Sequence, residues 1–206
     1  MKTLFTTTIF TLLLSFIAAS SIFATDTETN STATVWEIDR AHSAINFTIN
    51  HFFTPVDGTF SDYDADVHFD PENLEESRVN VTIPVSSVDT RNERRDGHLQ
   101  SDDFFNVEQW PNIQFTSHSI ESRGDNEFVA IGEMTIRDVT RDFELPFTLQ
   151  GVMDHPMQDD TVVAGITASA ELMRTDYGVG VGDWAATAVV GDKVDIQLNL
   201  ELTSGK

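Results

Sequence analysis

The sequence predicts an all-β domain of about eight antiparallel strands, arranged as a barrel or a sandwich. Most of the chain after residue 35 alternates apolar and polar side chains, which is the pattern of half-buried strands. Residues typical of turns separate these alternating segments, and no segment after the N-terminus has the periodicity of a long helix. A closed barrel of about eight strands is either filled by its own side chains or encloses one small ligand.

Residues 1–24, before the domain, are predicted to be a secretory signal peptide. Lys2 gives a short basic start, Leu4 to Ala19 form an apolar run, and small residues follow. The alternative is a membrane anchor, but threonines interrupt the run, which is short for a membrane span of about 20 residues. Residues 25–34 are polar and rich in threonine, which predicts a linker, and the folded domain is expected over residues 35–204.

The composition of the chain excludes several partners and chemistries. Lys and Arg number 12 against 34 Asp and Glu, which gives a formal net charge of −22. Nucleic-acid binding needs a basic face, and docking on anionic lipid is opposed by the same charge. Cysteine is absent, so disulfides, thiol catalysis and cysteine metal sites are excluded. An export signal without disulfides suits a bacterial periplasm, the expected location, at least as well as a eukaryotic secretome. No later segment is apolar enough for stable membrane insertion as a helix.

The first strands are predicted at 35–39 and 44–53. The apolar face of the longer strand consists of Ile45, Phe47, Ile49 and His51. His51 is interpreted either as a hydrogen-bonded core histidine or as a ligand contact. Residues 55–58, which include proline, aspartate and glycine, predict the turn that follows.

The next strand, at 59–70, carries Asp62, Asp64 and Asp66 on its polar face. This row lacks the central glycine and the terminal glutamate of an EF-hand calcium loop, so it is interpreted as a solvated strand face. In the strand at 78–88, Pro84 lies away from the apolar face, which predicts an edge or a bulge nearby.

Residues 90–105 break the alternation and predict a short helical insert around 91–105. Thr90 with Glu93 has the spacing of a capping box, and Ser101 is a second N-cap candidate. The insert also carries a polar cluster of Arg95, Asp96 and His98. Such a cluster either holds a loop in place or contacts a polar group of a ligand.

Further strands are predicted at 113–120, 127–136, 142–153, 161–173 and 194–202, with a glycine-rich loop at 177–188. The strand at 161–173 places Ala164, Ala168 and Ala170 opposite large aromatic residues of other strands, and the chain contains 15 Phe. Small residues facing aromatic ones favour a cavity, although a dry, packed core is an equal alternative.

Several short motifs are spread over the domain. They are Ile38-Asp39 with His42-Ser43, Val56-Asp-Gly58-Thr-Phe60, Phe69-Asp-Pro71, Arg95-Asp96-Gly-His98-Leu99, Asp103-Phe104-Phe105, Trp110-Pro111, Met134-Thr-Ile-Arg137, and Arg174 with Tyr177-Gly178. In combination they resemble the YceI-like family of polyisoprenoid-binding periplasmic proteins. Arg91 and Asp138 depart from the family pattern, which usually has glycine there. Aspartate tolerates a left-handed turn better than most residues, so the fold is expected to hold.

The resemblance implies a lipocalin-like, antiparallel eight-stranded β-barrel with a long apolar tunnel. It also implies a carrier or storage protein for an isoprenoid or another long-chain lipid, such as a polyprenyl or quinone-type molecule. No catalytic residue, metal or other cofactor is expected, and relatives suggest a homodimer. From strand alternation, the expected apolar wall consists of Phe47, Ile49, Tyr63, Val67, Phe69, Val81, Ile83, Phe115, Phe147 and Ile166. The expected polar end consists of His42, His51, Arg95, Asp96 and His98.

Two other functions stay open. His42, His51, His98 and nearby aspartates could form the site of a metal-dependent enzyme, although no H-E-x-x-H, G-x-S-x-G or paired-carboxylate motif is present. The barrel could also be a structural or stress-protective protein that holds no ligand. In that case its interior would be too full to accept a lipid tail.

Overall fold

Antiparallel strands dominate the computed structural model, which describes residues 32–186 and 188–206. The predicted signal peptide and most of the predicted linker lie outside these residues. The strands are β1 (Val35–Ile38), β2 (Ala44–His51), β3 (Thr54–Phe60), β4 (Asp64–His68), β5 (Arg78–Pro84), β6 (Val88–Asp89), β7 (Asn112–Gly124), β8 (Glu127–Ile136), β9 (Val139–Asp154), β10 (Thr161–Met173) and β11 (Val190–Gly205). The α-helix α1 spans Glu93–Gln100, and 3-10 turns lie at Leu74–Glu76, Val85–Ser87, Arg174–Tyr177 and Gly182–Trp184. Among the described residues, no helix combines the length and the apolar character needed to cross a membrane.

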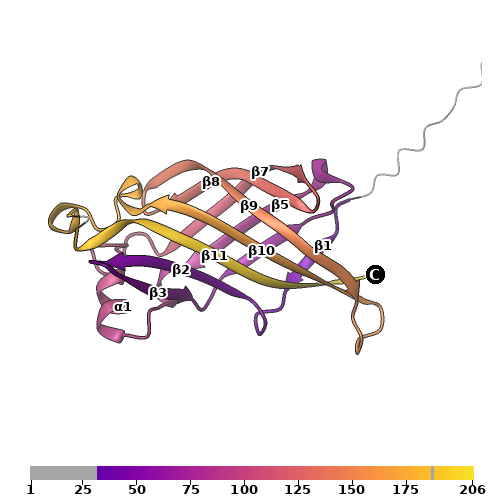
Figure 1. Cartoon of the computed structure of the whole chain (residues 1–206), viewed down its shortest axis with the longest axis horizontal. Coiled ribbons are helices and arrows are strands. Elements are labelled where there is room, and N and C mark those ends of the chain that lie inside the picture. Colours follow the sequence, from indigo (N-terminus) through magenta and orange to yellow (C-terminus); the bar gives the residue numbers. More distant parts are fainter. Residues whose placement is uncertain (1–31, 187) are drawn as a thin grey trace, which may run out of the picture. The chain divides into compact units, whose positions relative to one another are not determined.

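The sheet closes into the eight-stranded antiparallel barrel that the resemblance implies. Closure occurs because β1 pairs with β4 on one side and with β11 on the other. Three of the barrel strands are interrupted: β1 continues into β2 along β11, β3 continues into β4, and β5 continues into β6. Figure 1 shows these strands crossing the barrel obliquely, with α1 at one end and the C-terminus at the other.

The predicted turn at 55–58 is wrong, because these residues belong to β3. The chain reverses two residues earlier, at Phe52 and Phe53, where His51 pairs with Thr54. Phe52 has a φ of 53°, a left-handed conformation in which glycine or asparagine is far commoner than a bulky residue. The sequence therefore lacked the residue types that normally mark such a turn.

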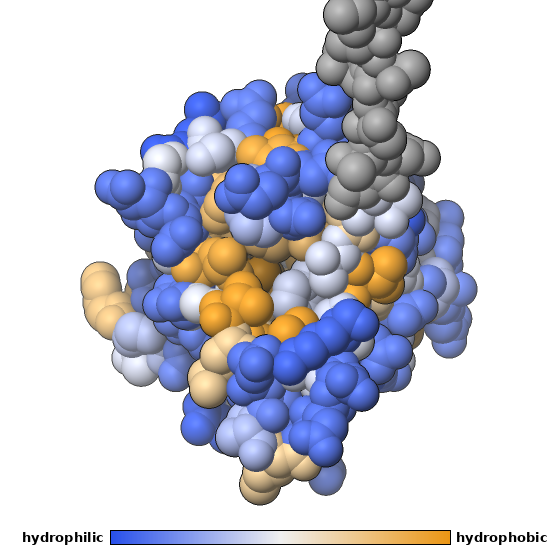
Figure 2. Space-filling view, turned by 90° about the vertical axis from the view of Figure 1, so that its right-hand side faces the viewer, coloured by the Kyte–Doolittle hydropathy of each residue, from blue (hydrophilic) through white to orange (hydrophobic). Residues whose placement is uncertain are grey.

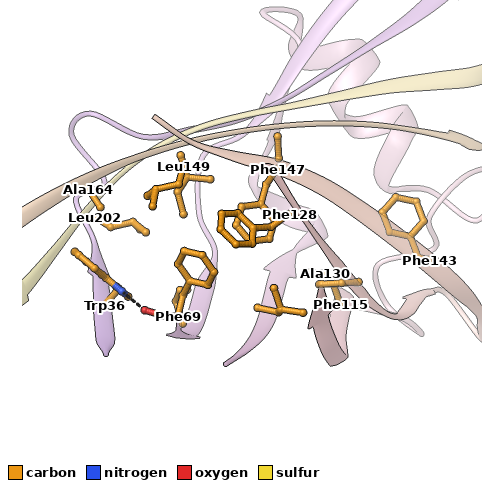
Figure 3. Close-up of a cluster of buried hydrophobic side chains, with 14 residues drawn as sticks. Trp36, Phe69, Phe115, Phe128, Ala130, Phe143, Phe147, Leu149, Ala164 and Leu202 are labelled. Carbon is orange, nitrogen blue, oxygen red and sulfur yellow. Dashed lines mark hydrogen bonds between the residues drawn. The ribbon is translucent and has the colours of Figure 1, made fainter. Parts of the chain in front are cut away.

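A packed core fills the half of the barrel that lies away from α1. Trp36 donates from Nε1 to the carbonyl oxygen of Phe69 at 2.8 Å. The ring of Phe128 stacks on Phe147 with centroids 5.4 Å apart, and Phe69 meets both rings edge-on (Figure 3). Each such aromatic pair contributes about 0.5–1.5 kcal/mol beyond its buried area. We call this half the packed end, and the half beside α1 the open end.

Candidate functional site

A cavity of about 790 Å³ occupies the barrel interior at the open end. Its volume lies within the range of about 300–1,000 Å³ that small-molecule sites have. Most of the wall is aliphatic or aromatic and comes from residues that point inward on β2 to β5, β7 to β9 and β11. The cavity reaches the exposed residues Asn50, His51, Asn92 and Arg94, so it opens to solvent beside α1 and the β2–β3 turn.

Six of the ten predicted wall residues line this cavity: Phe47, Ile49, Tyr63, Val81, Ile83 and Phe115. The ring of Phe47 packs directly over Gly58 of the neighbouring strand, where a Cβ atom would lie 2.3 Å from the ring. Tyr63 is 5% exposed, and its hydroxyl has no hydrogen-bond partner among the described residues. This part of the wall therefore offers an apolar surface, and the Tyr63 hydroxyl is buried behind it.

The other four predicted wall residues, Val67, Phe69, Phe147 and Ile166, do not line the cavity. They point inward as the alternation predicts, but they belong to the cluster that fills the packed end. Strand alternation tells which face a side chain takes and says nothing about how deep along the barrel it lies. The continuous tunnel that the resemblance implies is in this structure a cavity in one half of the barrel.

Three of the five residues predicted for the polar end, His51, Arg95 and His98, line the cavity near its opening. Asp96 and His42 do not line it. Asp96 lies on α1 behind Arg95, and His42 lies on the turn between β1 and β2. Whether any of these residues contacts a ligand stays a prediction.

The cluster of Thr90, Arg95 and Asp96 holds α1 against the end of β6. Arg95 donates from Nε to the Thr90 hydroxyl at 2.7 Å and from Nη2 to the Thr90 carbonyl at 2.6 Å. The Asp96 carboxylate accepts from the backbone N–H of Thr90 at 2.9 Å and also from its hydroxyl. Both charged side chains therefore bind Thr90, which is 3% exposed, and they fix the insert at the rim.

The predicted N-caps of the insert are wrong. The N-cap of α1 is Asn92, whose side chain accepts a hydrogen bond from the backbone N–H of Arg95 at 3.0 Å. Thr90 is not free to cap the helix, because its hydroxyl is bound to Arg95 and Asp96. Ser101 is the C-cap of α1 and does not begin a second helix. The hydroxyl of Thr90 is thus used by Arg95 and Asp96 of the same insert, and Asn92 caps the helix instead.

His98 connects α1 to the loop between β10 and β11. Its ring meets Trp184 at a centroid distance of 4.7 Å and Phe104 at 4.9 Å, both in edge-on geometry. Its Nε2 atom lies 3.0 Å from the Asp103 carboxylate. His98 and Trp184 both line the cavity, so this contact forms part of the rim.

Arg174, which appears in the sequence only as part of a short motif, lies at the rim of the cavity. It is 3% exposed and binds five backbone carbonyls of the loop before β11 and of the first residues of β11. These carbonyls belong to Val179 at 2.8 Å, Gly180, Trp184 at 2.9 Å, Val190 at 3.0 Å and Gly191 at 2.8 Å. Burial lowers the pKa of Arg174, yet an arginine keeps its proton in proteins. The charge therefore organises the backbone of a glycine-rich loop, whose Tyr177 and Val179 side chains are buried in the core.

Arg137 joins the same loop to the insert. It donates from Nη1 to the carbonyl oxygen of Phe104 at 2.9 Å and to that of Gly178, and its guanidinium lies 4.5 Å from the ring centroid of Trp110. Arg137 has a φ of 57°, so it takes the left-handed conformation of the β8–β9 turn. The expectation that Asp138 takes this conformation is wrong.

The histidines proposed for an enzyme do not form one site. His51 and His98 line the opening of the cavity, whereas His42 lies with Asp39 and Glu201, away from the lining. The Nδ1 atom of His42 is 2.8 Å from Asp39 and 3.6 Å from Glu201. Within the described part of the chain, these three side chains have ligand atoms within 4.8 Å of one another, as a metal site would need. Because His42 is exposed, the ion pairs alone explain the geometry.

The pKa of His42 is expected to lie above its ordinary value of 6.5, because the Asp39 hydrogen bond and charge favour the imidazolium form. The same contact lowers the pKa of Asp39. A raised histidine pKa stabilises the fold at pH values below 6.5, and this stabilisation is lost as the pH rises through the folded-state value. The lowered Asp39 pKa contributes stability above about pH 3.9, which is lost as the pH falls.

An NMR titration of the His42 ring protons in the wild type and in Asp39→Asn tests this prediction. We expect the pKa of His42 to fall in the variant. An unchanged pKa would mean that the contact is absent in solution.

Comparison with known proteins relates this chain to a group of bacterial proteins. The family model described as the YceI-like domain matches residues 36–202. The proteins called YceI of Salmonella arizonae and Salmonella newport are each 36% identical to the chain over 170 residues. The matched region is 81% of this chain and 86% of theirs.

Solved structures share the barrel. BcnA of Burkholderia cenocepacia has a TM-score of 0.71 and 25% identity, over 80% of this chain and 99% of BcnA. The YceI protein of Campylobacter jejuni has a TM-score of 0.63 and 32% identity, over 74% of this chain and 86% of that one. A polyisoprenoid binding domain from Saccharophagus degradans, implicated in plant cell wall breakdown, has a TM-score of 0.62 over 83% of this chain and 99% of its own length. At 12% identity, that domain shows likeness of fold alone.

Proposed function

Because the chain belongs to the YceI-like family, we propose that it is a carrier or storage protein that holds one isoprenoid or other long-chain lipid in its cavity. The observation that carries this proposal is the cavity of about 790 Å³ with a mainly apolar wall. A ligand-free structural protein would have no need of such a space, since packing the interior would stabilise it further.

The wall chemistry favours an apolar chain over a polar small molecule. Each methylene group removed from water contributes about 0.8 kcal/mol, so a long tail binds well without many polar contacts. Phe47, Ile49 and Leu198 are typical of the side chains that such a tail would meet. An isoprenoid tail, a quinone-type tail and a fatty acyl chain would each be accommodated by such a wall.

A polar headgroup would lie at the opening of the cavity, where the lining changes from apolar to polar and charged side chains. Arg94, Arg95 and His98 line this region together with Asn92. Arg95 is held by Thr90, so its role in the free protein is structural. Among the described residues, Arg94 makes no hydrogen bond or salt bridge, which makes it the better candidate for a headgroup contact.

We propose binding without catalysis, in the periplasm. Among the described residues, His51 and His98 contact mainly aromatic rings, and the polar side chain bound to His98 is the Asp103 carboxylate, so no nucleophile is paired with a base in the cavity wall. The compartment rests on the signal-peptide pattern of residues 1–24 and on the absence of cysteine.

Native mass spectrometry of protein purified from its own host tests the proposal. We expect a mass above that of the mature polypeptide, which is lost on denaturation, and a single long-chain lipid per chain in the solvent extract. The same spectra measure whether the protein forms the homodimer that relatives suggest. A bare polypeptide mass that does not change when quinone or fatty acid is added would contradict lipid binding.

A further inference from the structure

We propose that Phe52 and Phe53, at the tip of the β2–β3 hairpin, dock the protein on a neutral lipid bilayer beside the cavity opening. The proposal rests on the proposed lipid-binding function and adds its partner. The two side chains would enter the interface of the bilayer shallowly and reversibly, so that a lipid tail passes between membrane and cavity with little exposure to water.

The exposure of this aromatic pair is the first observation. Phe53 is 99% exposed and Phe52 is 56% exposed. Their only close ring contact is between Phe52 and His51, at a centroid distance of 4.6 Å among the described residues. The apolar surface of a ring that is not buried in the fold is available to contact a membrane.

The backbone of the turn is the second observation. Phe52 has a φ of 53°, which costs a bulky residue free energy and would suit glycine. Here the chain keeps phenylalanine at both turn positions, although smaller polar residues would make a better hairpin. Strain at an exposed position is typical of a site that binds something.

The position of the turn is the third observation. Asn50 and His51, which precede the turn, line the cavity at its opening. The N–H of Phe52 donates to the carbonyl of Val189 at 2.8 Å, which joins the tip to the rim loop that Arg174 organises. Because the tip of the β2–β3 hairpin is part of the rim, insertion of its two rings into a membrane would place the cavity opening against that membrane.

The charge of the molecule decides which membrane surface fits. A net charge of −22 opposes anionic lipid, which leaves neutral or zwitterionic lipid. Close to the opening, however, lie Arg91, Arg94 and Arg95, three of the 12 basic residues in the chain. Arg95 is bound to Thr90 and Arg91 lies 4.0 Å from Asp57, so the Arg94 guanidinium is the group that can contact the phosphates of zwitterionic lipids while the rings enter the interface.

The opposite end of the barrel provides a matched control. Val152, Met153 and Met157 near the β9–β10 turn are 51%, 62% and 86% exposed. Figure 2 looks onto this end and shows apolar side chains set among hydrophilic ones. The core behind them is packed, so these exposed apolar residues do not lie beside the cavity opening.

The test compares the wild type, F52G/F53S and the control M153S/M157S. Glycine relieves the strain of the turn, so F52G/F53S is expected to melt at or above the temperature of the wild type. Each protein is loaded with a pyrene-labelled fatty acid and mixed with phosphatidylcholine vesicles that contain a quencher lipid. Flotation with the same vesicles, without the probe, measures docking by itself.

For the wild type and M153S/M157S, the initial transfer rate is expected to rise in proportion to vesicle concentration. For F52G/F53S we expect a rate about tenfold lower that no longer depends on vesicle concentration, with weaker flotation. Equal rates for all three proteins, or equal losses in both variants, would overturn the proposal. Failure of every protein to take up the probe would count against lipid binding, and flotation would still decide whether the hairpin docks.

Discussion

Replacing Arg174 with alanine is expected to lower the free energy of unfolding by about 3–5 kcal/mol. The guanidinium is buried and satisfies five backbone carbonyls between Val179 and Gly191. Its removal leaves these carbonyls without their partner in a region that water enters poorly. The loop would then separate from β11, and the cavity would lose part of its rim.

Urea unfolding followed by tryptophan fluorescence measures this effect, since Trp184 is itself bound by Arg174. Arg174→Lys keeps the charge, but a single ammonium group cannot reach five carbonyls, so most of the loss is expected to remain. Arg141→Ala is the control, because the exposed Arg141 contacts Asp176 in the same region, and a surface pair contributes at most about 1 kcal/mol. A loss for Arg174→Ala as small as that for Arg141→Ala would contradict the structural role.

Filling the cavity at Ala65 is expected to abolish lipid binding without unfolding the barrel. Ala65 lies on β4 opposite Val81, and both residues line the cavity. A phenylalanine at this position would occupy the space of about four methylene groups of a bound tail. The lost contacts amount to about 3 kcal/mol, which is a decrease in affinity of more than about 100-fold. The fold has room for the ring, so the melting temperature should change little.

Ala168→Phe is expected to lower stability and to leave lipid binding intact, which is the opposite of Ala65→Phe. Ala168 is 4% exposed and belongs to the packed end, where it does not line the cavity. A phenylalanine there overfills the core and is expected to cost about 1–3 kcal/mol of stability, while folded molecules still bind lipid. Displacement of a fluorescent fatty acid and thermal unfolding measure both quantities. Unchanged binding in Ala65→Phe would show that the lipid lies elsewhere.

The barrel could be predicted from the sequence because alternation is a local signal. The predicted strands at 127–136 and 161–173 match β8 and β10, and the insert around 91–105 contains α1. The hairpin turn was missed because its left-handed position holds Phe52, which is a poor turn residue. The cap was missed because Thr90, which has the right spacing, is bound instead by the Arg95 and Asp96 side chains of α1.

The extent of the cavity could not be predicted, because the alternation of apolar and polar residues does not show how far along the barrel axis a side chain lies. Phe115 and Phe147 both point inward, yet one lines the cavity and the other packs against Phe69. Arg174 shows the same limit for polar residues. Its five partners are backbone carbonyls, and because every residue has one, the sequence does not indicate which of them Arg174 binds.

The packed half of the barrel has a consequence for the choice of guest. If a lipid occupies the cavity beside α1, it would enter tail-first from the open end, because the packed end blocks passage through the barrel. The aromatic rings of Phe69, Phe128 and Phe147 pack together beyond the cavity, so in the proposed carrier they would limit the length of tail that fits. Tails that reach the packed end with their heads at the opening should bind best, and longer ones must fold back or protrude.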